Sequence, residues 1–362
     1  MLSEELKHDE DKNFIKIWPY LDDISQEIIP YLLNRLSEDK NKNKVVVNLD
    51  FFNVKRINSS GSAIVLKKLI SLVLGDKYPR PFRLIMPEEK SIEQQMQNSG
   101  FLAILDSYFH FGKYYGDLFE QIKPVEINAN TENYISYDEQ LSIKKTAFPI
   151  FHLKYNPEKE RESVEQFADW LDNNVLSILN NYNIKTDSLF SVFTEIAKNS
   201  QDHTERDAFF GIDLLENMNT KRGEILFSCS DMGIGIARKV RQFLKENPQE
   251  NLRADMWKHG SLTDLYKWAF TVGNTTSKKV FPFALSDTTS KKIINKGIGM
   301  TMIIDGAHNL NMDLSFFDAH SMMQMPKSLF YFPESLNHEE LRRKVYNTGK
   351  KVGFYYYGRL KF

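Results

Sequence analysis

A row of polar residues beside an apolar helical face limits the possible folds of this chain more than any other part of the sequence. Within Thr194–His203, the residues Glu195, Asn199 and His203 follow one another at intervals of four. At about 100° per residue they lie on one side of a helix, next to a stripe of apolar and small residues. Asn is a poor residue for a helix interior, so the row predicts either a solvated shoulder or a polar site. An Asn amide oxygen suits Mg²⁺, and a carboxylate one turn earlier could act as a general base.

Two glycine-containing stretches follow this helix. Glu224–Asp231 alternates as a strand does and ends in an Asp that is followed by Gly233 and Gly235. A carboxylate at a strand end only accepts hydrogen bonds, so it can receive the exocyclic amine of adenine. The second stretch, Asn295–Ile304, is a glycine loop that enters a helix. The free N–H groups at such a helix start can bind phosphate.

In this order the three stretches resemble the Bergerat-fold (GHKL) ATP-binding domain that histidine kinases, anti-sigma-factor kinases and gyrase share. The resemblance covers residues 161–362 and implies that ATP and Mg²⁺ are bound. It implies that Asn199 is the Mg²⁺ ligand, Glu195 the general base and Asp231 the residue that holds the adenine amine. The other nucleotide-binding residues that it implies are His203, Gly233, Gly235, Thr276, Lys278, Lys296, Gly297, Gly299 and Met300.

The same resemblance makes residues 236–296 a long lid, and lids of this kind close over substrates. A helix is expected within Met256–Phe270, and Gly273–Lys278 is similar to the Thr/Ser–Lys segment of many family lids. The chain departs from the family pattern at Asn295, where a glycine is common, and at Met232, where an Asn is common.

Residues 1–115 show the alternation of strands and helices that is typical of an α/β domain. Strands are expected at Val45–Phe51 and Phe82–Met86, and helices at Phe14–Arg35 (interrupted by Pro30), Ala63–Leu74 and Ser91–Asn98. Residues 116–160 are expected to be a connector with some strand character, around Ile127 and Phe148–Leu153. Beyond it, helices are expected at Glu162–Asn181 and Met300–Ala307, and strands at Asp207–Glu216, Glu224–Ser230, Leu314–Phe317, Ser328–Phe332 and Val352–Phe362.

The N-terminal part resembles a STAS domain, the fold of anti-sigma-factor antagonists. The resemblance rests on Leu49–Phe51, on Asn58–Gly61 at the start of a helix, and on Ser99–Phe101. In that family a serine at this helix start can be phosphorylated, and Ser60, with Ser59 beside it, matches the position. The alternative is structural, because Ser is favoured at helix N-termini. The predicted fold class is therefore α/β and α+β, a STAS-like βαβα unit followed by a Bergerat α/β sandwich.

Composition narrows the classes of function. The chain has 362 residues and a net charge of −1, which indicates no strong field for nucleic acid or a membrane surface. No apolar run approaches the roughly 20 residues that span a bilayer, and Met1–Asp11 lacks the apolar core of a signal peptide. The single cysteine, Cys229, excludes an intrachain disulfide and favours a cytoplasmic protein.

Several functions stay open at this point. A conventional autophosphorylating histidine kinase is not expected, because His152 is not followed by an acidic residue and His338 lies beyond the last glycine pair. The leading expectation is a regulator that binds Mg-ATP and either hydrolyses it or phosphorylates Ser/Thr on a protein partner. The alternatives are an ATP-gated dimerisation clamp, which would make a homodimer, and a nucleotide sensor without catalysis. Nucleic-acid processing is the weakest alternative, since the sequence has no basic stripe.

Overall fold

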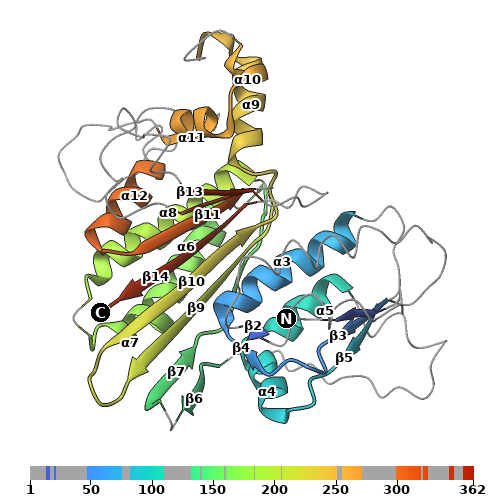
Figure 1. Cartoon of the computed structure of the whole chain (residues 1–362), viewed down its shortest axis with the longest axis vertical. Coiled ribbons are helices and arrows are strands. Elements are labelled where there is room, and N and C mark those ends of the chain that lie inside the picture. The colour runs from blue at the N-terminus through green and yellow to red at the C-terminus, as the bar shows by residue number, and fades with distance from the viewer. Residues whose placement is uncertain are drawn as a thin grey trace.

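The protein is known here from a computed structural model. It describes residues 14–16, 20–21, 47–75, 82–109, 132–138, 141–158, 160–182, 184–204, 206–250, 255–270, 299–318, 321–324, 342–345 and 354–362. These residues form a mixed α/β structure, as predicted. Figure 1 shows a large sheet with helices along it, and a smaller N-terminal unit beside that sheet.

Among the described residues the large sheet has nine strands, and every pairing between them is antiparallel. The strands are β6 (Tyr134–Asp138), β7 (Ile143–Ala147), β8 (Phe151–Leu153), β9 (Ala208–Asn217), β10 (Gly223–Asp231), β11 (Asp313–Asp318), β12 (Ser321–Gln324), β13 (Arg342–Val345) and β14 (Phe354–Lys361). Their order is β13-β12-β11-β14-β10-β9-β7-β6. Strand β8 pairs with the first residues of β9, and β7 pairs with the last ones.

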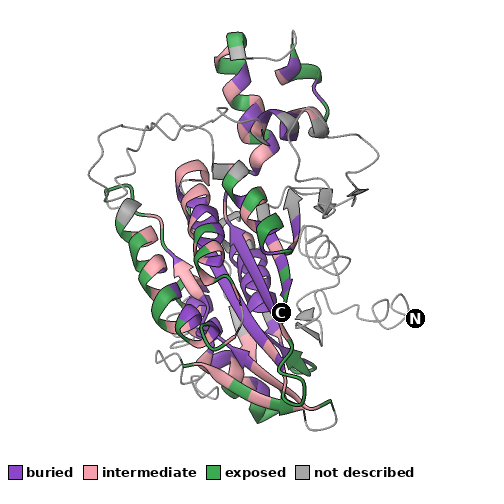
Figure 2. Cartoon of the chain, turned by 90° about the vertical axis from the view of Figure 1, so that its left-hand side faces the viewer, coloured by how far each residue is buried: buried purple, intermediate pink, exposed green. Residues whose placement is uncertain are grey.

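One face of this sheet is covered by α6 (Glu160–Trp170), a π-helical segment (Leu171–Leu176), α7 (Ser177–Leu179), α8 (Thr186–Thr204) and α12 (Gly299–Asn309). Alternate residues of β9 and β10, such as Phe210 and Phe227, point into the core under these helices. The rings of Phe193 on α8 and Phe227 on β10 lie 4.6 Å apart. Figure 2 shows the central strands and the inward sides of these helices as buried.

A helical projection follows β10 and extends from the end of the sheet (Figure 1). It consists of α9 (Ile236–Glu246), a 3₁₀ turn (Pro248–Glu250), α10 (Met256–His259) and α11 (Leu262–Phe270). The helix predicted over Met256–Phe270 is therefore interrupted at Gly260. The Arg241 guanidinium on α9 donates to the carbonyl oxygen of Gly260 at 2.6 Å, and so it binds the C-terminal end of α10.

The N-terminal unit contains a three-stranded parallel sheet in the order β1 (Phe14–Lys16), β3 (Val47–Asp50), β5 (Phe82–Ile85). A second parallel pair joins β2 (Tyr20–Leu21) to β4 (Arg56–Ile57). Its helices are α3 (Ser59–Gly75), α4 (Lys90–Asn98) and α5 (Phe101–Phe109). Buried apolar residues of α3 and α5 pack against Leu49 and Phe51, and the rings of Phe51 and Phe101 meet edge to face at 5.6 Å.

Several predicted elements are confirmed and a few need correction. The helix predicted from Phe14 is wrong at its start, because β1 pairs in parallel with β3 and β2 pairs with β4. Strands β6, β7 and β8, in the segment predicted to be a connector, belong to the large sheet. Helix α5 and strands β12 and β13 were not predicted. The strand predicted at Ser328–Phe332 and the extended piece at Ile127 lie outside the described residues.

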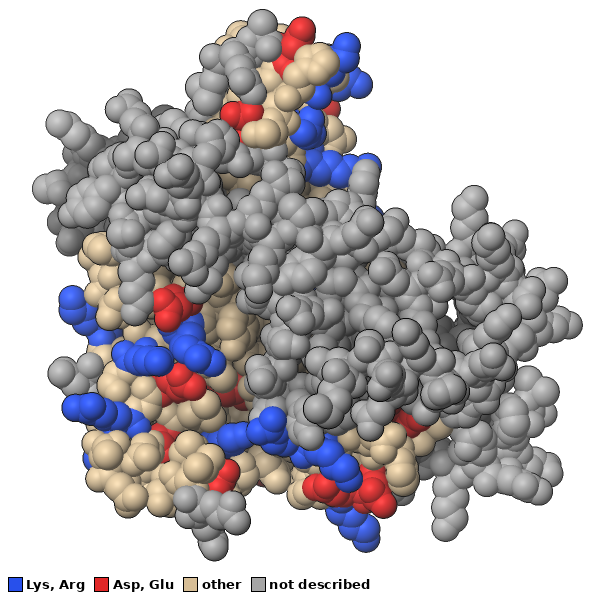
Figure 3. Space-filling model, in the orientation of Figure 1, with Lys and Arg blue, Asp and Glu red and all other residues tan. Residues whose placement is uncertain are grey.

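Two general properties agree with the composition. Within the described ranges, none of the helices is both long and apolar enough to cross a membrane. On the face shown in Figure 3, basic and acidic side chains of the described residues are interspersed, in keeping with a net charge of −1.

Candidate functional site

Helix α8 carries the predicted polar row along the edge of its buried face. Phe193, Ile196 and Ala197 are fully buried against the sheet, which fixes the rotation of the helix about its axis. This rotation leaves Asn199 and His203 half-buried and Glu195 only 7% exposed. The row is therefore at the boundary between the core and the space beside it, as the spacing predicts.

Glu195 is a buried acid whose hydrogen bonding is incomplete. Its Oε1 atom lies 3.5 Å from Nζ of Lys198, one turn along the same helix. Its Oε2 atom is buried and has no hydrogen-bond partner among the described residues. Burying a charged oxygen without a partner is costly, and native proteins satisfy most such atoms. The Glu195 carboxylate is thus a group that a water or a ligand would complete.

Asn199 contacts the start of α12, which the sequence predicts to be a glycine loop that enters a helix. Its Nδ2 atom lies 3.7 Å from Sδ of Met300, the second residue of α12. The buried Tyr356 on β14 also donates its hydroxyl to Met300 Sδ, at 3.5 Å. Since α12 begins at Gly299, the N-terminus of that helix lies next to the C-terminal half of α8. Asn199 and the predicted glycine–helix junction are therefore neighbours.

The loop after β10, which carries the other predicted glycine pair, lies against the end of α8. Asp231 is the last residue of that strand, 3% exposed, and its Oδ1 atom accepts the Gly233 N–H at 2.8 Å. A Cβ atom added to Gly233 would lie 2.6 Å from the Thr204 side chain, so the loop is pressed against the end of α8. Gly235 has φ 86°, a backbone conformation that favours glycine, and it precedes α9. Both glycines of the predicted motif are thus required by the local geometry.

His203 lies among cations that the sequence analysis did not single out. Burial, followed by the charges of Lys239 on α9 and Lys198 on α8, lowers the pKa of His203 to about 4. The imidazole is therefore neutral near pH 7, and two ammonium groups lie near it. Such a cluster is suited to an anion such as a phosphate group. The only signal in the sequence is that Lys198 precedes Asn199 and that Lys239 lies four residues after Gly235.

The lowered pKa of His203 predicts a pH dependence of stability. An unfolded His binds a proton near pH 6.5, whereas His203 in the folded protein does so only near pH 4. Between these values the unfolded state holds more protons, so this residue lowers the free energy of unfolding as the pH falls. Urea unfolding at pH 7 and pH 4.5 should show a larger loss for the wild type than for His203→Gln. Equal losses in the two proteins would contradict this assignment.

The residues present are compatible with a bound Mg²⁺ ion. In the part of the chain that the structure describes, there is no group of three or more His, Cys, Asp or Glu residues that could hold a metal. Mg²⁺ often takes one or two protein ligands and completes its shell with water and substrate phosphates. Asn199, one helical turn after Glu195 and next to the start of α12, fits this pattern of few protein ligands.

The other predicted site residues fall into two groups. Thr276, Lys278, Lys296 and Gly297 lie outside the described residues, so their roles stay predictions. Ser59 and Ser60, the predicted phosphosite, lie away from this site and are 0% and 1% exposed. The Ser59 hydroxyl donates to the Phe148 carbonyl oxygen. Asn58 caps the helix by accepting the Gly61 N–H at 2.7 Å, so neither serine is the cap.

Comparison of the chain with protein-family models, with curated proteins and with solved structures finds no match. The functional assignment therefore depends on the motifs and on the geometry described above.

Proposed function

We propose that this protein is a Mg-ATP-binding regulator with a Bergerat-type (GHKL) nucleotide domain behind a STAS-like N-terminal unit. It would act by hydrolysing ATP or by transferring the γ-phosphoryl group to a Ser or Thr of a protein partner. The supporting observation is the meeting of three segments that are far apart in the sequence. Asn199 on α8 contacts Met300 at the start of α12, and Thr204 at the end of the same helix contacts Gly233.

Each segment supplies a different part of nucleotide recognition. The carboxylate of Asp231 would accept the exocyclic amine of adenine, since a carboxylate cannot donate to it. The N–H groups at the start of α12 would face the phosphates, and the positive end of the helix favours their charge. Mg²⁺, when bound through Asn199, would neutralise charge on the phosphate oxygens. Lys198 and Lys239 lie near the same place and would add positive charge.

Glu195 supports a catalytic function over passive binding. In hydrolysis a water oxygen forms a bond to the γ-phosphorus as the bond to the bridging oxygen breaks, and ADP leaves. The carboxylate of Glu195 would take the proton that this water loses. In transfer to a partner, the same carboxylate would take the proton of the attacking Ser or Thr hydroxyl. Its Oε2 atom, which is buried and has no hydrogen-bond partner among the described residues, would be the atom that takes this proton.

Incubation of the full chain with γ-labelled ATP and Mg²⁺ tests this proposal. Release of labelled phosphate would indicate an ATPase, and label on the protein or on an added partner would indicate a kinase. Bound nucleotide without either product would indicate a sensor and would overturn the catalytic role of Glu195. Absence of both binding and turnover would overturn the whole proposal.

A further inference from the structure

Helix α3 of the N-terminal unit is docked by its first residues on the large sheet. It packs on β9 and β10. The strand residues that face α3 alternate with the strand residues in the core under α8, so α3 lies on the opposite face of the sheet from α8. Oδ1 and Oδ2 of Asp213 on β9 accept the N–H groups of Ser59 and Ser60, both at 2.8 Å. Asp213 is 2% exposed. A carboxylate from another part of the chain thus satisfies two N–H groups that a helix start leaves open.

The surrounding contacts allow little freedom at this junction. A Cβ atom on Gly211, two residues before Asp213, would lie 1.9 Å from the Ser59 carbonyl oxygen, so a glycine is needed for this close approach. Ser228 on β10 donates its hydroxyl to the Ser60 carbonyl oxygen at 2.6 Å. The backbone of α3 is therefore bound directly to both central strands of the large sheet.

The N-terminal unit also reaches the loop after β10, at the candidate nucleotide site. The Ser71 hydroxyl, three turns further along α3, is directed at Sδ of Met232 at 3.9 Å. Met232 lies between Asp231 and Gly233, and its N–H donates to the Asp207 carbonyl oxygen at 2.9 Å. The Asp207 carboxylate accepts the hydroxyl of Tyr108 on α5. Helix α3 thus contacts the segment that carries Asp231 and Gly233, and α5 is linked to that segment through Asp207.

We infer that docking of α3 holds the Asp231–Gly235 loop in its binding conformation, so that the N-terminal unit and nucleotide binding are energetically coupled. The inference rests on the proposed function, because it concerns the same loop. The docked arrangement binds nucleotide more tightly than the undocked one, and by reciprocity nucleotide stabilises docking. Anything that separates Ser59 and Ser60 from Asp213 would weaken nucleotide binding from the opposite face of the sheet.

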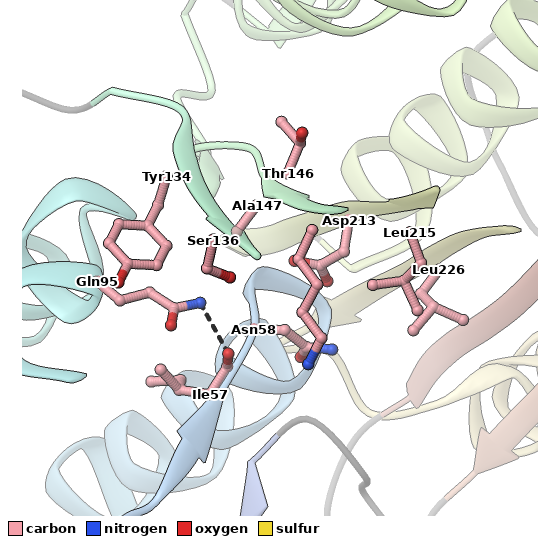
Figure 4. Close-up of a pocket in the computed structure, with 11 residues that line it drawn as sticks. Ile57, Asn58, Gln95, Tyr134, Ser136, Thr146, Ala147, Asp213, Leu215 and Leu226 are labelled. Carbon is pink, nitrogen blue, oxygen red and sulfur yellow. Dashed lines mark hydrogen bonds between the residues drawn. The ribbon is translucent and has the colours of Figure 1, made fainter. Parts of the chain in front are cut away.

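A small pocket beside Asp213 marks the edge of the docked surface. Asn58, Asp213 and Lys145 are among the residues that line it, and Gln95 on α4 donates to the Ile57 carbonyl oxygen at 2.7 Å next to it (Figure 4). Its volume of about 50 Å³ has room for ordered water but is small for an organic ligand. We therefore assign this region to contact between the two parts of the chain.

Two substitutions in the full chain test the coupling. Gly211→Val places a side chain against the Ser59 backbone, and Asp213→Asn removes one of the two acceptors at the start of α3. Hydrogen exchange at Ser59–Ser62 reports docking, and calorimetric titration with Mg-ADP reports affinity. Asp187→Asn, at the exposed start of α8, is the matched control. We expect faster exchange in both variants and an affinity for Mg-ADP lower by about fivefold or more, the usual range of coupling between sites.

The outcomes separate this inference from the proposed function. If exchange accelerates while the Mg-ADP affinity stays equal to that of the control, the coupling is wrong and nucleotide binding stands. If the wild type binds no Mg-ADP, both proposals fall. If Gly211→Val does not fold, Asp213→Asn gives the same comparison. Unchanged exchange in a folded variant would show that these residues do not hold α3, and it would overturn the inference at its first step.

Discussion

Glu195→Gln is expected to lower ATP turnover by about 10²- to 10⁴-fold, the usual contribution of a positioned general base. The side chain keeps its size, and its amide can still lie beside Lys198, so nucleotide affinity should stay within about threefold of the wild type. The loss arises because an amide cannot accept the proton of the attacking water or hydroxyl. Steady-state phosphate release, measured together with calorimetric affinity for Mg-ADP, gives both quantities.

The matched control for this prediction is Glu165→Gln, on the exposed side of α6. It should change neither turnover nor affinity. If the Glu195→Gln protein turns over ATP at the wild-type rate, Glu195 is not the general base of the reaction. Its buried Oε2 atom, which has no hydrogen-bond partner among the described residues, would then need another explanation.

Asp231→Asn is expected to weaken ATP binding by about 10- to 100-fold, the equivalent of a hydrogen bond to a charged group. The Asn side chain can still accept the Gly233 N–H through its oxygen, so the turn after β10 should be kept. The NH₂ group of the new Asn would face the exocyclic amine of adenine, and these two donors cannot form a hydrogen bond with each other. Affinity for GTP, which presents a carbonyl oxygen at that position, should fall much less.

The ratio of ATP to GTP affinity is therefore the informative quantity for Asp231. Competition titrations with both nucleotides measure it in wild type, Asp231→Asn and the surface control Asp187→Asn. Affinities for ATP and GTP that both stay at their wild-type values in Asp231→Asn would mean that Asp231 does not recognise the base. Equal weakening of ATP and GTP would instead indicate a collapse of the loop.

Elements whose pattern is local could be predicted from the sequence. The strand β10 ends at the Asp before the two glycines, and α8 and α12 have their expected places. The row Glu195, Asn199 and His203 follows from helical spacing alone. These predictions succeed because burial of one helix face, and the turn after a strand, are set by neighbouring residues.

Elements that depend on distant partners could not be predicted. Residues Phe14–Lys16 are short enough to be helix or strand, and the pairing of Ile15 with Leu49 decides between them. The strands of residues 134–153 join the large sheet through β9, whose paired residues lie 55 to 74 positions further along the chain. Such pairing depends on contacts between residues far apart in the chain.

The docking of α3 on the large sheet also depends on side chains that are far apart in the sequence. Gly211 and Asp213 interrupt the apolar run Ala208–Leu215 of β9, and that is a detectable signal. The sequence does not say which helix start faces them. The same contact explains why Ser59 and Ser60, the predicted phosphosite at a helix start, are buried: the docked sheet covers them.

Isothermal titration of the full chain with Mg-ADP, and with a non-hydrolysable ATP analogue, tests the central proposal most directly. The convergence of Asn199, Asp231 and the start of α12 predicts saturable binding at one site per chain. Asn199→Ala, which removes the proposed Mg²⁺ ligand, should reduce the dependence of that binding on Mg²⁺. A flat titration of folded wild-type protein, with adenine nucleotides in excess, would contradict the account.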